Sequence, residues 1–265
     1  MSENNDLLNK IISNLEYQKQ VFGDNYYSEK VEIPIREIST ENSEKIEEPV
    51  EVEVPVPAFS IQEEEMPKKS TIDTDWKNSK ELNVLYDKIH NCLECELGQT
   101  RNEFVFGSGN PNADLLIIGE APGADEDKQG LPFVGRAGQL LTKIIEAINF
   151  TRDDVYIANI IKCRPPNNRR PKTDEVEKCE PYLQKQIELI DPKFILALGK
   201  TAIDTLLKKD HTMRDIRGEF IDYNGRKLMV TYHPAALLRN PNWKRPVWED
   251  VKKLRAAYDE IVGKE

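Results

Sequence analysis

Four cysteines are the residues whose spacing points most directly to chemistry in this chain of 265 residues. The cysteines are Cys92 and Cys95, which form a Cys-x2-Cys turn, then Cys163 after 67 intervening residues, and Cys179 after 15 more. In a reducing compartment such a set is more typical of metal ligands than of disulfides. Four thiolates suit zinc or a [4Fe–4S] cluster. The wide split of the second pair favours the cluster, because zinc ribbons usually repeat the Cys-x2-Cys turn.

Polar side chains follow several short apolar segments. Four segments are apolar on both faces and bounded by turn residues, as buried parallel strands are. They span 114–119, 155–161, 193–199 and 227–232. In sheets of this kind ligands bind just beyond the carboxyl ends of the strands, which here carry Glu120, Asn159, Gly199 and His233. The sequence therefore predicts that a carboxylate, an amide and an imidazole meet in one crevice.

Helical patterns alternate with these segments. Apolar residues recur at helical spacing over 140–148 and 251–261, and Thr173 is a good N-cap for another helix. Strands that alternate with helices are typical of an α/β domain. We therefore predict a three-layer α/β/α fold over residues 76–265, with a mainly parallel central sheet of four strands.

The charge of the chain is divided unevenly. Its 47 acidic and 37 basic side chains give a net charge of −10, which is unusual for a protein that binds nucleic acid. Residues 1–75 alone carry a net charge of −11, so the remaining residues carry +1. The acidic, proline-containing composition of residues 1–75 predicts a disordered low-complexity extension. A helical period over 6–20 predicts one short helix there, which is a candidate for binding a protein partner.

Nothing in the sequence indicates a membrane protein or a secreted one. No apolar run approaches the ~18–20 residues that span a bilayer. The first residues also lack the basic and apolar regions of a secretory signal. We therefore expect a soluble protein of the cytoplasm.

Two windows beside the predicted crevice contain basic residues and no acid. Residues 155–173 carry five basic side chains, Lys162 among them, and residues 223–248 carry five more. Such windows beside a pocket fit contacts with the phosphates of DNA, and would place the protein with the nucleoid. The main candidates for these contacts are Arg164, Arg169, Arg170 and Arg239.

Loop motifs connect these observations. They are Gly119-Glu-Ala-Pro-Gly123 with Gly130-Leu-Pro-Phe-Val-Gly-Arg-Ala-Gly138 after the first strand, Asn159 to Arg169 after the second, and His233-Pro-Ala-Ala-Leu-Leu-Arg239 after the last. With these motifs and the four cysteines in matching order and spacing, residues 78–263 resemble the family 4 uracil-DNA glycosylases. This family is the iron–sulfur branch of the uracil-DNA glycosylase superfamily.

The resemblance implies a role for each motif residue. A glycosylase extrudes its target nucleotide and reads the base in a pocket. Phe133 matches the aromatic residue that stacks on the base, Asn159 the amide that reads uracil O4 and N3–H, and His233 the histidine that faces O2. Glu120 matches an acidic residue near uracil C5, where it would exclude the thymine methyl group. The other positions that match the family's base-binding loop are Gly119 and Ala121.

The residue that would activate water stays open. Family 1 enzymes carry an Asp two residues after the leading Gly of the first motif, and this chain has Ala121 there. The base is therefore Glu126, Glu120 or no side chain at all. No lysine occupies a motif position suited to Schiff-base attack. We therefore expect a monomer that hydrolyses the N-glycosidic bond of uracil in single- or double-stranded DNA without cleaving the strand.

Two other functions are kept as alternatives. A uracil-DNA binding or cross-linking module would trap the sugar with a histidine, as in a relative with a histidine-containing insertion after the cysteine loop. The corresponding residues 165–172 contain no histidine. A zinc-stabilised interaction protein would use the cysteines without catalysis, and iron and sulfide in a ~1:1 ratio would exclude that metal assignment.

Overall fold

The computed structural model describes residues 12, 16, 19, 21 and 74–263. The first four positions are helical and belong to the N-terminal extension, whose other residues lie outside the described part. Most of the helix predicted over 6–20 therefore lies outside it too. None of the helices described has the length and hydropathy needed for a membrane span.

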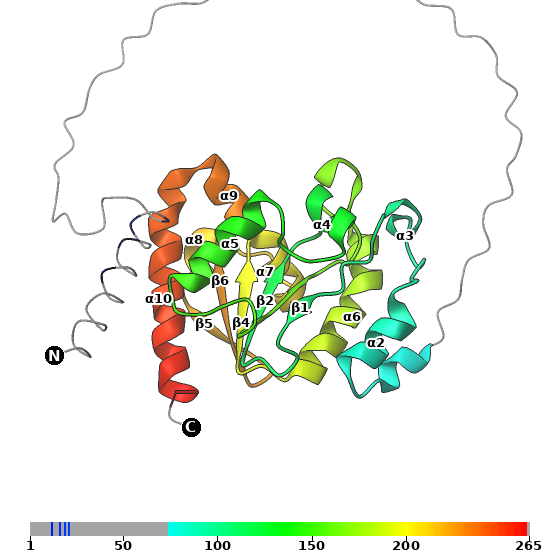
Figure 1. Ribbon diagram of the computed structural model, residues 1–265, viewed down its shortest axis with the longest axis horizontal. Helices are drawn as coiled ribbons and strands as arrows, with labels where there is room; N and C mark the ends of the chain where they lie inside the picture. The colour runs from blue at the N-terminus through cyan, green and yellow to red at the C-terminus, as the bar shows by residue number, and fades with distance from the viewer. Residues whose placement is uncertain (1–11, 13–15, 17–18, 20, 22–73, 264–265) are drawn as a thin grey trace, which may run out of the picture. The chain divides into compact units, whose positions relative to one another are not determined.

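A mixed sheet of six strands forms the centre of the fold (Figure 1). The strands are β1 (Ser108–Gly109), β2 (Leu115–Gly119), β3 (Tyr156–Asn159), β4 (Phe194–Leu198), β5 (Phe220–Tyr223) and β6 (Arg226–Thr231). They lie in the order β1-β3-β2-β4-β6-β5, and the four inner strands are parallel to one another. The edge strands β1 and β5 pair antiparallel with β3 and β6.

The predicted α/β class is confirmed, but the prediction of a four-stranded, mainly parallel sheet is wrong. The four predicted segments form the inner strands, and the two edge strands were missed. β1 has only two residues, and most side chains of β5 are partly exposed, so neither gives the pattern of a buried strand. The sequence does contain one indication of β5. Asn224-Gly225 is typical of a tight hairpin turn, and it forms the turn between β5 and β6, with positive φ at both residues.

Helices cover both faces of the sheet and complete the three predicted layers (Figure 1). One face packs against α2 (Leu82–Ile89), α6 (Thr173–Ile190) and α7 (Lys200–Leu207). The other packs against α5 (Arg136–Glu146), α9 (Pro234–Arg239) and α10 (Lys244–Ile261). The shorter helical elements are η1 (Thr74–Asn78), α3 (Leu97–Thr100), α4 (Ala124–Gln129), η2 (Pro166–Asn168), α8 (Met213–Ile216) and η3 (Pro241–Trp243).

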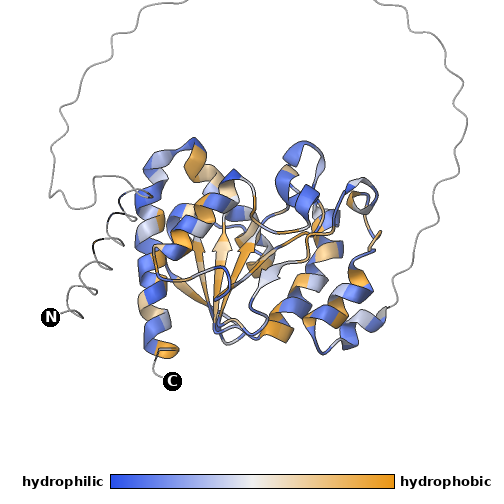
Figure 2. Ribbon diagram, viewed as in Figure 1, coloured by the Kyte–Doolittle hydropathy of each residue, from blue (hydrophilic) through white to orange (hydrophobic). Residues whose placement is uncertain are grey.

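Strand residues alternate between the two cores. In β2, Leu116 and Ile118 belong to the core under α6, whereas Leu115 and Ile117 belong to the core under α5. Side chains of a strand point alternately to opposite faces, so a strand covered on both faces is apolar throughout. Figure 2 shows this as strands coloured hydrophobic between helices that are hydrophilic on their outer sides.

The parallel strands end at one edge of the sheet. Gly119 of β2 pairs with Asn159 of β3, and Leu198 of β4 pairs with Thr231 of β6. The segments that leave these ends therefore start side by side. This register brings together the loops that the sequence analysis selected as the crevice.

A buried carboxylate fixes the end of β6 to α10. Asp250 accepts a hydrogen bond from Thr231 Oγ1 at 2.6 Å and pairs with Arg217 Nη2 at 3.0 Å. Arg217 also donates to the carbonyl of Pro246 at 2.8 Å. Burial raises the pKa of Asp250 to about 6, although Thr231 and Arg217 oppose this shift. Because Thr231 lies two residues before His233, this anchor helps to position the last motif.

We expect R217M to destabilise the fold strongly, because it leaves the Asp250 carboxylate buried without its cation. Breaking a buried pair in this way costs about 3–5 kcal/mol. The matched control is K253M. Lys253 of α10 pairs at 3.0 Å with Glu219, which directly precedes β5, and both side chains are exposed. An exposed pair contributes at most about 1 kcal/mol. Urea unfolding of both variants tests the difference, and equal losses would contradict it.

Candidate active site

A pocket of about 650 Å³ opens at the carboxyl ends of the parallel strands. It collects residues from the loops after β2, β3 and β6, which are far apart in sequence. Predicted site residues that line it are Glu120, Ala121, Glu126, Phe133, Asn159, Arg169, His233 and Arg239. The crevice predicted from strand ends therefore exists, and it holds the carboxylate, the amide and the imidazole together.

Gly119 lies where the pocket is tightest. A Cβ atom at this position would stand 2.4 Å from Asn159 Oδ1 and 2.5 Å from Cζ of Phe133. Real Cβ atoms do not approach other atoms so closely, so any side chain here would displace the amide or the aromatic ring. The contribution of Gly119 is the space that it leaves between β2, Asn159 and Phe133.

Phe133 is held in an unusual backbone conformation. Its φ of 54° lies in the left-handed region, which bulky residues rarely adopt, and its side chain is buried. Arg152 stabilises this loop by donating to the carbonyls of Phe133 at 3.1 Å and Pro132 at 2.7 Å. Gly138 of α5 leaves room for the Phe133 carbonyl, since a Cβ would stand 1.9 Å from it. Such strain commonly marks a functional site.

Asn159 presents an amide that is buried and has no hydrogen-bond partner. The residue is 1 % exposed, and neither Oδ1 nor Nδ2 has a partner among the described residues. Buried polar groups are almost always paired, and leaving one unpaired costs roughly 1–3 kcal/mol. An amide that lines a pocket in this state offers one acceptor and one donor side by side. It fits a ligand with the complementary pair.

His233 is a neutral imidazole with a defined tautomer. It precedes α9, and its Nδ1 lies 3.1 Å from the backbone nitrogen of Ala235. Because that backbone N–H can only donate, Nδ1 must accept and the ring proton must be on Nε2. Burial, and to a smaller degree the charge of Arg239, lowers the pKa of His233 to about 4. The centroid of its ring lies 5.5 Å from that of Phe133, and the residue lines the pocket.

The two candidate carboxylates differ in their partners. Oε1 of Glu126 accepts from the backbone nitrogens of Val134 and Gly135, both at 2.9 Å, and Oε2 accepts from that of Gly123 at 3.1 Å. Glu126 therefore fastens the loop after β2 to the loop that carries Phe133. Glu120 has no such contacts in the described structure. Its carbonyl accepts from Ile161 at 3.2 Å, and its side chain lines the pocket.

The basic residues of the first window have unequal access to a ligand. Lys162 is fully buried, so the prediction that it adds to a phosphate-binding surface is wrong. Arg169 lines the pocket but forms a two-bond ion pair with buried Glu175, at 2.5 and 2.8 Å. Arg164 donates to Asn168 at 2.8 Å. A sequence window shows the number of basic residues but not which of them face solvent.

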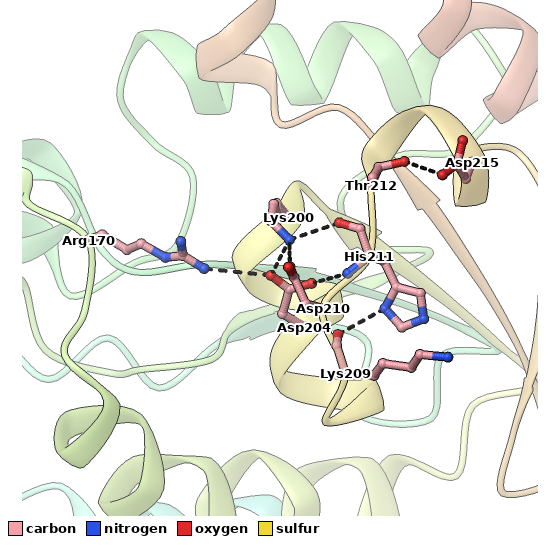
Figure 3. Close-up of polar contacts among 8 residues, drawn as sticks. All are labelled: Arg170, Lys200, Asp204, Lys209, Asp210, His211, Thr212 and Asp215. Carbon is pink, nitrogen blue, oxygen red and sulfur yellow. Dashed lines mark hydrogen bonds and ion pairs between the residues drawn. The ribbon is translucent and has the colours of Figure 1, made fainter.

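Arg170 belongs to a polar network around the start of α7 (Figure 3). It lies 3.7 Å from Asp204, which also pairs with Lys200 at 2.9 Å. Lys200 further contacts Asp210 and donates to the carbonyl of His211 at 2.8 Å. The network fixes the loop after α7 and touches the loop of Arg170. Sequence reasoning missed Lys200, although it follows Gly199 directly at a strand end.

The four cysteines gather on the face of the sheet under α2 and α6. Cys163 Sγ accepts from Arg101 at 3.3 Å, Cys179 Sγ accepts from the backbone of Lys162 at 3.3 Å, and Cys92 Sγ lies 3.4 Å from the hydroxyl of Tyr182. None of the four forms a disulfide. Burial raises the pKa of Cys163 to about 11 and also raises those of Cys95 and Cys179. Neighbouring cysteines raise these pKa values further, which places the four in one neighbourhood.

Comparison with known proteins agrees with this site. Residues 106–252 match the sequence model of the family described as the "Uracil DNA glycosylase superfamily". The chain is 44 % identical to a type-4 uracil-DNA glycosylase of Saccharolobus solfataricus over 66 % of this chain and 86 % of that protein. It is 43 % identical to one of Sulfurisphaera tokodaii (66 % and 83 %) and 41 % identical to one of Thermotoga maritima (66 % and 93 %).

The fold and pocket define an α/β protein that binds its ligand at the carboxyl ends of parallel strands. Within that class, the chain belongs to the uracil DNA glycosylase superfamily and to its type-4 branch. The resemblance inferred from the motifs is thereby confirmed. The match covers the sheet and every loop of the pocket.

We expect E126Q to lower stability because one of its oxygens becomes an NH2 group that cannot accept from a backbone N–H. An unsatisfied buried donor costs roughly 1–3 kcal/mol, and because Glu126 is only partly buried we expect the lower end, about 1 kcal/mol. The control is D125N, since Asp125 is exposed on the same helix and its change should stay within about 0.5 kcal/mol. Urea unfolding provides the measurement. If both variants unfold like the unchanged protein, Glu126 does not fasten the two loops.

Proposed function

We propose that this protein removes uracil from DNA by hydrolysing the N-glycosidic bond, leaving an abasic site. The observation that carries the proposal is the unpaired, buried amide of Asn159. Uracil presents O4 and N3–H side by side, which is the complement of an amide donor and acceptor. Cytosine has a donor where uracil has O4, so an amide held in one orientation would discriminate against it.

The base would be bound between rigid groups. A flipped uracil would stack on Phe133, and stacking of a base on an aromatic ring contributes ~1–3 kcal/mol. The strained loop of Phe133 and the gap at Gly119 keep that ring beside the amide. The pocket is thus organised before substrate arrives, which lowers the cost of ordering it during binding.

His233 would stabilise the leaving base. Breaking the bond between N1 and C1′ gives an oxocarbenium-like sugar and a uracil anion, and negative charge develops on O2. A donor aimed at that oxygen stabilises the transition state more than the ground state. The tautomer set by Ala235 places such a donor on Nε2. The low pKa keeps the imidazole neutral at physiological pH.

We assign the contact with attacking water to Glu120 and a positioning role to Glu126. Both oxygens of Glu126 already accept backbone hydrogen bonds, whereas no described residue occupies the carboxylate of Glu120. The described residues that line the pocket include no lysine, which supports hydrolysis without Schiff-base chemistry. Strand cleavage by the protein itself is therefore not expected.

We also propose that the four cysteines hold a [4Fe–4S] cluster. The donor set fits, because four thiols from separate elements lie close enough to shift one another's pKa. Among the described residues, however, no three or more cysteine, histidine or carboxylate side chains converge as the ligands of one ion. A cluster of four irons keeps its ligand sulfurs farther apart than a single zinc does. When bound, the cluster would tie the Cys92–Cys95 turn to β3 and α6.

Contacts with DNA would surround the mouth of the pocket. Arg239 lies at its rim at the end of α9, and Leu238 beside it is a large apolar side chain that is 47 % exposed. Arg164 and Arg170 lie on the neighbouring loop. We propose that these residues bind the phosphates and flank the extruded nucleotide of uracil-containing DNA, with the chain acting as a monomer.

Removal of either pocket group should suppress excision. We expect N159A to lose about 10–100-fold in kcat/KM, because uracil loses both hydrogen bonds, and H233A to lose about 10²–10³-fold in kcat. H211A is the control, since the side chain of His211 contacts only Lys209 among the described residues. The assay measures uracil release from single-stranded and duplex DNA, followed by alkali. No release by an iron-containing preparation, or strand cleavage without alkali, would overturn the proposal.

The pH profile tests the state of His233. Since its pKa in the folded protein is about 4 rather than 6.5, excision should not fall as the pH drops through 6.5, and the histidine limb should appear near 4. The unfolded chain, in contrast, takes up a proton on this residue between pH 6.5 and 4 that the folded chain does not. The unfolding free energy should therefore decrease as the pH falls through that window, and H233Q should remove this dependence.

A further inference from the structure

Lys162 is a buried ammonium group without a carboxylate partner. It is 0 % exposed, and its Nζ donates to Gln186 Oε1 at 2.5 Å and to the carbonyl of Asn159 at 2.9 Å. Both acceptors are neutral, and no ion pair of Lys162 occurs among the described residues. A buried charge is normally compensated by an opposite one. Lys162 therefore indicates a negative charge next to it that these two acceptors do not supply.

The cysteines provide the neighbouring groups that can carry this charge. Lys162 precedes Cys163 in the chain, and its backbone N–H donates to Cys179 Sγ at 3.3 Å. Arg101 approaches from another side, where Nη1 donates to Cys163 Sγ at 3.3 Å and to the carbonyl of Cys92 at 2.6 Å. Nη2 of Arg101 donates to the carbonyl of His90 at 2.7 Å. No described carboxylate pairs with Arg101 either, so Arg101 contacts Cys163 through its side chain and Lys162 contacts Cys179 through its backbone, each without an acidic partner.

The charges balance if the thiols hold the cluster. Four thiolates carry about −4, and a four-iron core in its usual oxidised state carries about +2, so the bound cluster has a net charge of about −2. One lysine and one arginine supply an equal and opposite charge.

We propose that Lys162 and Arg101 are the counter-cations of the cluster, and that Lys162 transmits its presence to the base-reading end of β3 through the carbonyl of Asn159. This inference rests on the proposed cluster and on the proposed reading of uracil by Asn159. Lys162 thereby becomes a positioning residue for a side chain in the pocket, although it does not line the pocket. Arg101 shares the charge compensation but does not contact Asn159.

The experiment compares K162M and R101M with K185M in the full-length, cluster-containing protein. Lys185 is the matched control, because it is also buried but pairs with Glu188 at 2.7 Å and contacts no cysteine. The readouts are iron and sulfide content, the rate at which an iron chelator bleaches the absorbance near ~400 nm, and the reduction potential of the cluster. Uracil excision is then measured per bound cluster.

We expect K162M and R101M to lose the cluster about 10–100-fold faster than the unchanged protein. The potential of the remaining cluster should become more negative, because removal of a cation disfavours added electrons. K162R and R101K should restore part of both properties, and K185M should change neither. Only K162M should lower kcat per bound cluster, since only Lys162 bonds to Asn159. Unchanged cluster loss and potential in K162M and R101M would overturn the inference.

The outcomes separate this inference from the proposed function. Absence of iron from the unchanged protein would refute the proposed cluster, and failure of the iron-containing protein to release uracil would refute the proposed function itself. If K162M does not fold, R101M decides the charge compensation, because Arg101 is only half-buried. The link to Asn159 is then tested by chelating the cluster from the unchanged protein. Excision should fall while circular dichroism shows the helices intact, and undiminished excision would refute the link.

Discussion

The pocket depends on how closely the ends of β2 and β3 approach each other at Gly119. Gly119 and Asn159 are paired residues of neighbouring parallel strands, so the amide rises directly beside a residue without a side chain. The ring of Phe133 also lies against Gly119, where a Cβ atom would collide with it. A methyl group at position 119 would break this arrangement. The register of two buried strands thus determines where Asn159 and Phe133 lie.

This arrangement is costly for the folded protein. An unpaired buried amide and a phenylalanine in the left-handed region each cost roughly 1–3 kcal/mol. Neither would persist unless the surrounding structure enforced it. Arg152 and Gly138 stabilise the loop of Phe133, and Glu126 fastens that loop to the end of β2. A ligand that satisfies the amide and covers the ring recovers these costs, as the proposed binding of uracil would.

Sequence reasoning succeeded where a local pattern has a direct structural consequence. Buried parallel strands are apolar on both faces, and their ends meet at one edge, so Glu120, Asn159 and His233 could be placed together before the structure was known. The short edge strands lack that pattern and were missed. Glu126 accepts from backbone nitrogens of a different loop, at Val134 and Gly135. Lys162 is buried against Gln186 of α6, which is distant in sequence. A motif or a charge count contains no information about such partners.

The distribution of charge explains why a catalytic region with almost no net charge can bind an anion and contain buried cations. In the described part, several basic side chains pair with nearby acids, as Arg169 does with Glu175 and Lys200 with Asp204. Lys162 and Arg101 instead contact carbonyls, a side-chain amide and cysteine sulfur. Under the proposed cluster, the negative charge that these two cations lack would come from the thiolates and the bound cluster. Because Asn159 ends β3 and its carbonyl accepts from Lys162, which directly precedes Cys163, the pocket and the cysteines are linked through one strand end.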